Sequence, residues 1–122
     1  MIQMAVLDLF SVNDKVVVIT GASSGLGVAF ADAFSQAGAD IAMGARRLDR
    51  LAQTASLVQA NGRRALPVPT DVADPASCQA LVDAAVGEFG RVDVLINNAG
   101  IGTAVPATKE TPEQFRQVIA IN

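Results

Sequence analysis

The 122-residue chain contains no histidine, tyrosine or tryptophan, and only one cysteine. The lack of histidine and tyrosine leaves Asp, Glu, Lys and one thiol as side chains for proton transfer. Without histidine, the lone Cys78 cannot belong to a Cys/His cluster that holds a metal ion, so we expect no metal. A single cysteine also excludes an internal disulfide, which favours a reducing compartment. We therefore expect a cytoplasmic protein.

An excess of positive charge and long apolar runs are also absent. Nine Lys and Arg residues against twelve Asp and Glu residues give a net charge of -3, so no overall basic field exists to hold nucleic acid or an anionic membrane. No stretch approaches the roughly 18 apolar residues of a membrane span. Residues 1–12 also lack the basic start of a signal peptide. We expect neither nucleic acid nor a membrane as a partner.

Apolar, β-branched runs alternate along the chain with longer segments of helical period. This alternation is typical of βαβ units and a parallel sheet. Strands are expected at 16–19, 40–45, 65–69 and 93–96, with helices at about 26–37, 48–60 and 75–90 and a last helix that opens after Thr111. The sequence thus predicts an α/β fold, a doubly wound parallel sheet with strand order 3-2-1-4 and right-handed crossovers.

The helical periodicity also predicts buried faces. The first helix is expected to bury Leu26, Ala29, Phe30, Ala33, Phe34 and Ala37, and the second helix to bury Leu48, Leu51, Ala55 and Val58. Cys78 shares a stripe with Val82, Ala85 and Phe89, so it is expected to be a small buried hydrophobe rather than a nucleophile. Arg63, Arg64 and Arg91 are expected on the solvated surface.

The end of the chain lacks the signals that usually close a helix. The apolar period through Phe115, Val118 and Ile119 runs on to Asn122 without a glycine, a proline or a polar tail. The strand at 93–96 is apolar at consecutive positions, yet no later strand remains to pair with it. We interpret residues 1–122 as the N-terminal part of a single larger domain whose C-terminal half is absent.

A glycine-rich turn joins the first strand to the first helix. Its residues lie where free backbone N–H groups and the helix dipole favour a phosphate, and they are Gly21, Ser23, Ser24, Gly25, Leu26 and Gly27. No Gly-Lys-Ser/Thr occurs there, so a nucleoside triphosphate loop is not supported. A simple strand-to-helix connection is the alternative.

Two further motifs follow the ends of predicted strands. Asp71-Val72 comes after the third strand, and Asn97-Asn98-Ala99-Gly100 comes after the fourth. In an open parallel sheet, ligands bind along the edge formed by the carboxyl ends of the strands. Alternatively, Asp71 caps the following turn, and the two asparagines form a turn that satisfies its own backbone.

These motifs, taken in order, make the chain resemble the classical short-chain dehydrogenase/reductase family. That family has the cofactor turn Thr-Gly-x-x-x-Gly-x-Gly, to which residues 20–27 are similar. The resemblance implies a Rossmann-type, three-layer αβα fold that binds a nicotinamide dinucleotide. It also implies an adenine contact at Asp71-Val72, cofactor contacts at Asn97, Ala99 and Gly100, a catalytic-group position at Asn122, and a homo-oligomer, either a dimer or a tetramer.

The choice between NAD(H) and NADP(H) depends on the end of the second strand. Asp40 lies at the count expected for an acidic residue that holds a ribose 2′-hydroxyl, but it begins the strand and so lies about 16 Å from the ligand edge. At that edge stand Ala45, Arg46 and Arg47. A guanidinium group can bind a 2′-phosphate with two hydrogen bonds. The sequence therefore predicts NADP(H).

We expect the nucleotide-binding half of an oxidoreductase that transfers a hydride between NADP(H) and an alcohol or carbonyl substrate, similar to a 3-oxoacyl or related ketone reductase. The family also uses a serine and a Tyr-x-x-x-Lys pair, and this chain has no tyrosine. The chain alone is therefore expected to be inactive. The alternative is a non-catalytic module that binds a dinucleotide or a partner protein.

Overall fold

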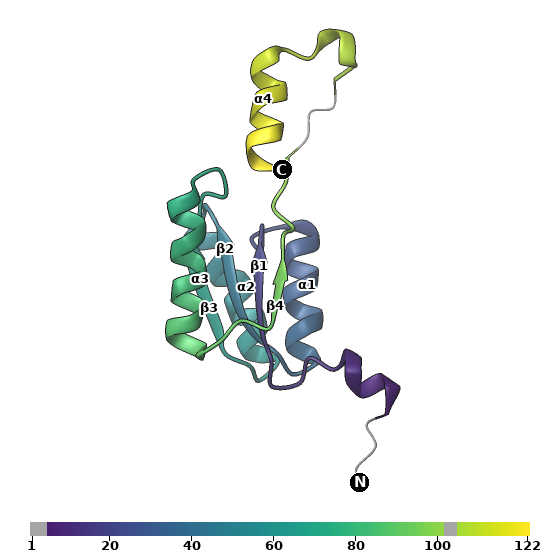
Figure 1. Cartoon of the computed structure of the whole chain (residues 1–122), viewed down its shortest axis with the longest axis vertical. Helices are drawn as coiled ribbons and strands as arrows, with labels where there is room; N and C mark the ends of the chain where they lie inside the picture. Colours follow the sequence, from purple (N-terminus) through teal and green to yellow (C-terminus); the bar gives the residue numbers. More distant parts are fainter. Residues whose placement is uncertain (1–4, 102–104) are drawn as a thin grey trace.

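The computed structural model describes residues 5–101 and 105–122. Helices and strands alternate over most of this length (Figure 1). The strands are β1 (Val16–Thr20), β2 (Asp40–Ala45), β3 (Ala65–Pro69) and β4 (Val94–Ile96). The α-helices are α1 (Gly25–Gln36), α2 (Leu48–Ala60), α3 (Pro75–Phe89) and α4 (Pro112–Ile121), and two short 3-10 turns are η1 (Val6–Phe10) and η2 (Ala107–Lys109).

The strands form one parallel sheet in the order β3-β2-β1-β4, which confirms the predicted order. In the register, Val18 of β1 lies beside Ala42 of β2 and Leu95 of β4, and Ala42 lies beside Leu66 of β3. All pairs are parallel, so the carboxyl ends of the strands meet at one edge. The four segments that the sequence singled out, at 21–27, 45–47, 71–72 and 97–100, all lie at this edge.

The sheet is the middle of three layers, as expected for a Rossmann-type fold. Every residue of β1 is buried because helices cover both of its faces. Val17, Ile19, Ile41 and Met43 pack toward α1 and α2, while Val18 and Ala42 pack against Leu81 and Ala85 of α3. The core therefore lies on both sides of β1 and β2 and holds their carboxyl ends rigidly.

The buried face of α1 differs from the expected one. The helix buries the small residues Gly27, Ala31 and Ser35, while Phe30 and Phe34 only border the core. Leu26, Ala29, Ala33 and Ala37 are exposed. Because α1 packs closely on the glycine turn and on α2, small side chains fit the contact better than large ones. In α2, Leu51, Ala55 and Val58 are buried as expected, but Leu48 is exposed.

The expected helix signals are present. The Asp74 side chain accepts a hydrogen bond from the Ala76 N–H at the start of α3. Thr111 and Gln114 form the predicted capping box of α4.

Cys78 is only partly buried, which corrects the expectation of a buried hydrophobe. Its thiol lies 3.5 Å from the Val72 carbonyl oxygen. It faces a cavity beside β4 that no described helix fills.

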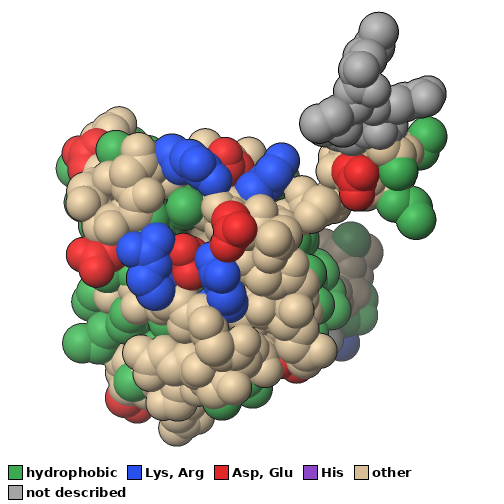
Figure 2. Space-filling model, turned by 90° about the horizontal axis from the view of Figure 1, so that it is seen from below, with side chains coloured by type: hydrophobic (Ala, Val, Ile, Leu, Met, Phe, Trp, Pro, Cys, Tyr) green, Lys and Arg blue, Asp and Glu red, His purple; other side chains and the backbone are tan. Residues whose placement is uncertain are grey.

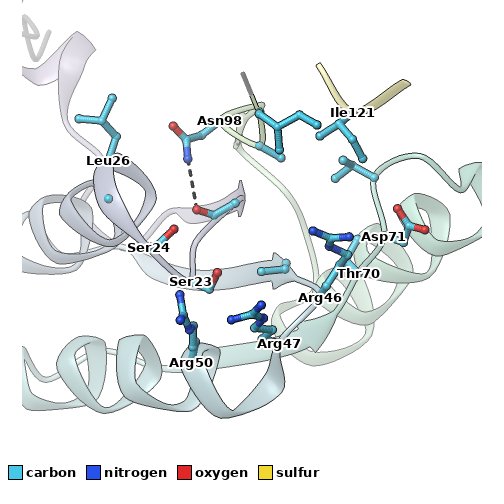
Figure 3. A pocket seen from close by; sticks show the side chains of 18 residues that line it. Ser23, Ser24, Leu26, Arg46, Arg47, Arg50, Thr70, Asp71, Asn98 and Ile121 are labelled. Atoms are coloured by element: carbon cyan, nitrogen blue, oxygen red, sulfur yellow. Dashed lines mark hydrogen bonds between the residues drawn. The ribbon is translucent and has the colours of Figure 1, made fainter. Parts of the chain in front are cut away.

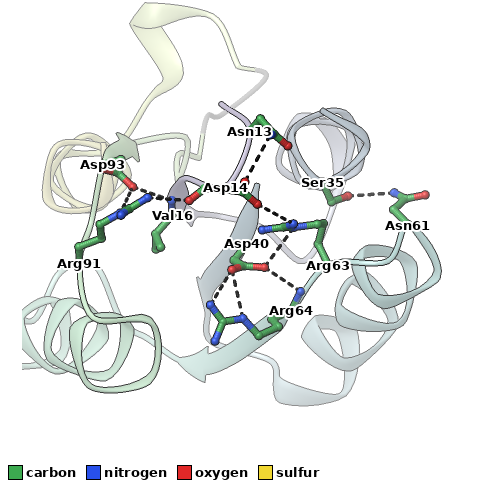
Figure 4. A network of polar contacts seen from close by, with 10 residues as sticks. All are labelled: Asn13, Asp14, Val16, Ser35, Asp40, Asn61, Arg63, Arg64, Arg91 and Asp93. Carbon is green, nitrogen blue, oxygen red and sulfur yellow. Dashed lines mark hydrogen bonds and ion pairs between the residues drawn. The ribbon is translucent and has the colours of Figure 1, made fainter. Parts of the chain in front are cut away.

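The arginines expected on open surface form ion pairs at the amino ends of the strands (Figure 4). Arg64 donates two side-chain hydrogen bonds to Asp40, of 2.8 and 3.1 Å. Arg63 lies between Asp14 and Asp40, and Arg91 pairs with Asp93 at 2.8 Å. Figure 2 shows basic and acidic side chains gathered together over one face. These charged residues are far apart in the sequence, and loops from separate strands bring them together. Sequence spacing therefore did not predict their pairing.

Two parts of the described chain lie outside the packed layers. The α4 helix extends away from the sheet (Figure 1), and none of its residues is buried. On β4, Leu95 is 51% exposed because no described element covers that face of the strand. Among the described residues, no helix is long and apolar enough to cross a membrane.

Candidate functional site

A cavity of about 480 Å³ lies at the carboxyl edge of the sheet (Figure 3). It lies between the glycine turn, the β2–α2 connection, the loop after β3 and the loop after β4. The lining residues are Gly21, Ser23, Ser24, Gly25, Leu26, Gly44, Ala45, Arg46, Arg47, Arg50, Thr70, Asp71, Val72, Asn98, Ala99, Gly100, Ile101 and Ile121. The structure thus brings together most of the residues that the sequence placed in a site.

The glycine turn keeps its part of the cavity open. Gly21 has a φ of +68°, and a Cβ atom there would lie 2.8 Å from the Cα atom of Ala99. Gly25 has a φ of +55° and would carry its Cβ into empty space. Both backbone conformations favour glycine, and the space beside Gly25 lets a ligand approach the backbone. Within the described chain, Ser24 at the N-cap of α1 makes no side-chain cap hydrogen bond.

Gly27 does not line the cavity. It lies beneath the turn, where a Cβ atom would collide with the Gly21 carbonyl group. Gly27 therefore lets α1 pack against the turn.

The loop after β4 braces the glycine turn. The Asn98 side-chain amide donates a 3.3 Å hydrogen bond to the Gly21 carbonyl oxygen, and the Ala99 N–H donates a 3.1 Å bond to Thr20 Oγ1. The Asn98 side chain thus has a structural role across the edge. Its backbone N–H stays within its own turn and donates a 3.0 Å hydrogen bond to the Ile96 carbonyl oxygen. Asn97 points elsewhere and lines the neighbouring cavity of about 330 Å³.

Positive charge gathers where β2 ends and α2 begins. Ala45 ends β2, and the exposed Arg46 and Arg47 follow it into the cavity lining. Sequence reasoning missed Arg50, which also lines the cavity. The signal was available, because Arg50 follows Arg46 and Arg47 at steps of four and three residues, the spacing that brings helical neighbours together.

Asp71 both lines the cavity and organises its own loop. Its side chain accepts a 3.0 Å hydrogen bond from the Ala73 N–H, and its own N–H donates to Ser77 Oγ at 2.9 Å. The alternative interpretation of Asp71 as a turn cap is therefore confirmed. The lining also includes Thr70 and Gly44, which sequence reasoning did not single out.

Asn122 lies outside the main cavity. Its side chain accepts a 2.7 Å hydrogen bond from the Ile101 N–H and donates a 2.9 Å bond to the Ile101 carbonyl oxygen. It therefore closes the loop between β4 and α4 and lines the smaller cavity. Its neighbour Ile121 reaches the main cavity.

The chemistry of the cavity suits an elongated anion. Glycine backbone at the start of α1 offers N–H groups, and the guanidinium groups of Arg46, Arg47 and Arg50 offer charge-assisted donors. Asp71 supplies an acceptor at the far end. Among the described residues, no group of three or more His, Cys, Asp or Glu side chains is placed to hold a metal ion.

The chain is similar in sequence to known proteins. The family model described as short chain dehydrogenase matches residues 15–122. An uncharacterized oxidoreductase of Staphylococcus saprophyticus is 43% identical over 113 residues, which is 92% of this chain and 45% of that protein.

Two solved structures resemble the fold as well. The structure of an NAD⁺-bound xylitol dehydrogenase has a TM-score of 0.85 and 31% identity, and the match covers 89% of this chain and 42% of that one. An alcohol dehydrogenase from the archaeon Thermococcus sibiricus, complexed with 5-hydroxy-NADP, has a TM-score of 0.82 and 37% identity, with 88% and 46% covered.

The chain spans less than half the length of these relatives. The parallel sheet, the glycine turn at its carboxyl edge and the match over residues 15–122 agree. This chain belongs to the short-chain dehydrogenase family, and it is the N-terminal half of such a fold.

Proposed function

We propose that the chain binds NADP(H) and forms the cofactor-binding part of an oxidoreductase that acts on an alcohol or carbonyl group. One observation carries the choice of NADP(H) over NAD(H). Arg46, Arg47 and Arg50 line the cavity where β2 ends, and Ala45 stands there without a carboxylate. A carboxylate at this place would accept a ribose 2′-hydroxyl and repel a 2′-phosphate.

The residues present fit a dinucleotide. The volume of about 480 Å³ is in the range of small-molecule sites. The open space at Gly25 is what a pyrophosphate needs in order to approach the backbone. Among the solved relatives, one holds an NADP analogue and another holds NAD⁺, so the relatives support a nicotinamide dinucleotide without choosing between the two.

Each part of the cavity has a task in this proposal. The turn from Gly21 to Leu26 binds the pyrophosphate, and Arg46, Arg47 and Arg50 bind the 2′-phosphate. Asp71 and Val72 hold the adenine. Ala99 and Gly100, together with Asn98, shape the wall between the turn and the loop after β4. The cofactor supplies the hydride chemistry when it is bound.

This chain supplies the cofactor site but not the proton. It has no tyrosine, and Asn122 is engaged with the Ile101 backbone. We propose that a proton donor and the substrate-holding elements come from the rest of the domain. The single cysteine supports our further proposal that the whole protein works in the cytoplasm, and family resemblance supports a homo-oligomer.

A titration with NADPH and NADH tests the proposal. Arg46→Ala should weaken NADPH binding about tenfold or more, since a charge-assisted hydrogen bond contributes roughly 1.5–3 kcal/mol. NADH binding should stay nearly unchanged. Arg116→Ala is the matched control, because Arg116 is an exposed arginine of α4 that does not line the cavity. Equal affinity for both dinucleotides, unchanged in Arg46→Ala, contradicts the proposal.

A further inference from the structure

Thr54 is a buried polar side chain in the middle of α2, with an exposed fraction of 2%. Its Oγ1 donates a 2.8 Å hydrogen bond to the carbonyl oxygen of Ala22, a fully buried residue of the glycine turn. The carbonyl oxygen of Arg50 lies farther away, at 3.5 Å. Because the hydroxyl group has a single proton, the shorter bond to Ala22 takes it.

Thr54 lies on the same side of α2 as one of the cavity arginines. It follows Arg50 by four residues, which places the two along one side of the helix, and Arg47 is the N-cap residue directly before the helix begins. Figure 3 shows Ser23 of the glycine turn opposite Arg47 and Arg50. The Thr54 hydroxyl therefore joins α2, which carries these guanidinium groups at its start, to the turn that carries Ser23.

Packing alone does not require a hydroxyl at this position. The other buried residues of α2 are Leu51, Ala55 and Val58, all apolar. A valine has nearly the shape of threonine and would fill the same space. What valine cannot do is hold the Ala22 carbonyl group, which in the described structure lies beneath the anion-binding turn.

We propose that Thr54 is a positioning residue for dinucleotide selectivity, because its hydroxyl sets the distance between the glycine turn and the arginines of α2. This inference rests on the proposed function. NADP(H) would contact both parts at once, with its pyrophosphate on the turn and its 2′-phosphate on the arginines. NAD(H) lacks the 2′-phosphate, so its affinity depends less on that distance.

The test compares Thr54→Val with Thr54→Ser in the 122-residue chain by titration with NADPH and NADH. Thr54→Val should lower the ratio of the NADH to the NADPH dissociation constant about tenfold, the loss expected when one charge-assisted contact is misplaced. Thr54→Ser keeps the hydroxyl and should keep the ratio. Ser56→Ala is the matched control, because the exposed Ser56 hydroxyl donates its hydrogen bond to the Ala52 carbonyl oxygen within α2.

The selectivity ratio separates positioning from a merely structural role. A lower melting temperature of Thr54→Val with an unchanged ratio overturns the inference. If the valine variant does not fold, Thr54→Cys replaces it, since a thiol is a weaker donor of similar size. The ratio of the NADH to the NADPH dissociation constant must then fall in Thr54→Cys and stay unchanged in Thr54→Ser. Equal ratios in the two variants overturn the inference. Absence of dinucleotide binding by the unsubstituted chain overturns the proposed function itself, whereas binding with a ratio insensitive to Thr54 overturns this inference alone.

Discussion

Single residues have different roles at the two ends of the sheet, where one end has a cavity and the other has ion pairs. At the carboxyl edge, Gly25 and Arg46 leave space and charge for a ligand. At the amino edge, Asp40 is buried and takes hydrogen bonds from Arg64. This explains why the linear count to Asp40 misleads. The acidic residue belongs to a structural ion-pair cluster at the opposite end of β2 from the cavity.

Replacement by valine should have different effects at Gly25 and at Gly27. The valine of Gly25→Val fills the open space and should weaken dinucleotide binding more than tenfold. Tenfold corresponds to about 1.4 kcal/mol of binding free energy. The fold should persist, although the positive φ costs roughly 1–2 kcal/mol. Gly27→Val collides with the Gly21 carbonyl group and should lower stability as well. Melting curves and NADPH titration of both variants check this, and unimpaired binding by Gly25→Val contradicts it.

Acid should destabilise the chain through Asp40 and Asp93. Burial raises the pKa of Asp40, but the hydrogen bonds from Arg64 and the charges of Arg63 and Arg64 together outweigh it and lower that pKa. Hydrogen bonds from the Val16 N–H and from Arg91 lower the pKa of Asp93. A depressed pKa stabilises the fold above the unfolded value near 3.9, and that contribution is lost as the pH falls through the folded pKa.

Melting temperatures should therefore change little between pH 5 and pH 7, roughly the range in which unperturbed carboxylates stay ionised. The chain also has no histidine to titrate there. Below about pH 4 the melting temperatures should fall steeply. Asp40→Asn should reduce this slope and lower the free energy of unfolding by about 1–3 kcal/mol at neutral pH. Thermal melts from acid to neutral pH measure both effects, and an equally steep slope in Asp40→Asn argues against the role of Asp40.

At the scale of elements, periodicity and end signals predicted the strands and their order well. Strands such as Val16–Thr20 are continuous apolar runs, and the cap at Asp74 is a local signal. The prediction of the buried face of α1 was wrong because α1 packs close to the glycine turn. This close packing favours the small residues Gly27, Ala31 and Ser35, whereas the prediction looked for large apolar residues. Arg50 and the pairing of Arg64 with Asp40 were missed because both depend on contacts that only the folded chain brings together.

The strand β4 should make the chain prone to self-association. It lies at one edge of the described sheet, and Leu95 on it is 51% exposed. An apolar edge strand offers unpaired backbone groups to a second chain. Leu95→Lys should shift the sedimentation profile toward monomer, whereas Val86→Lys on the exposed side of α3 should leave it unchanged. An identical profile for both variants is the contrary result.

At the scale of the whole molecule, our proposal gives this chain the cofactor site but not the groups that hold the substrate. The cavity gathers residues from all four strand ends, but α4 packs against no other described element, and relatives are more than twice as long. Binding and catalysis should therefore separate in this chain. In this proposal, dinucleotide binding depends on the cavity at the carboxyl edge, and positioning of a substrate depends on groups that the cavity does not supply.

The 122-residue chain should consequently transfer no hydride at a useful rate. It lacks a tyrosine to exchange the substrate proton, and such acid–base help contributes about 10²–10⁴-fold. The absorbance of NADPH, followed with a panel of ketones and aldehydes, measures this. Turnover by a purified chain whose intact mass confirms the end at Asn122 would show that another residue supplies the proton.

We propose that the carboxyl edge of the sheet binds a dinucleotide that carries a 2′-phosphate. The most direct test of this proposal is an amide NMR titration of the isotope-labelled chain with NADP⁺ and with NAD⁺. With NADP⁺, we predict saturable shifts at residues 21–26 and at residues 46–50, which line the cavity or adjoin it. With NAD⁺, the shifts at 46–50 should be much smaller. Shifts at 46–50 that are equal for both dinucleotides, or no saturable shifts at this edge, would contradict the account.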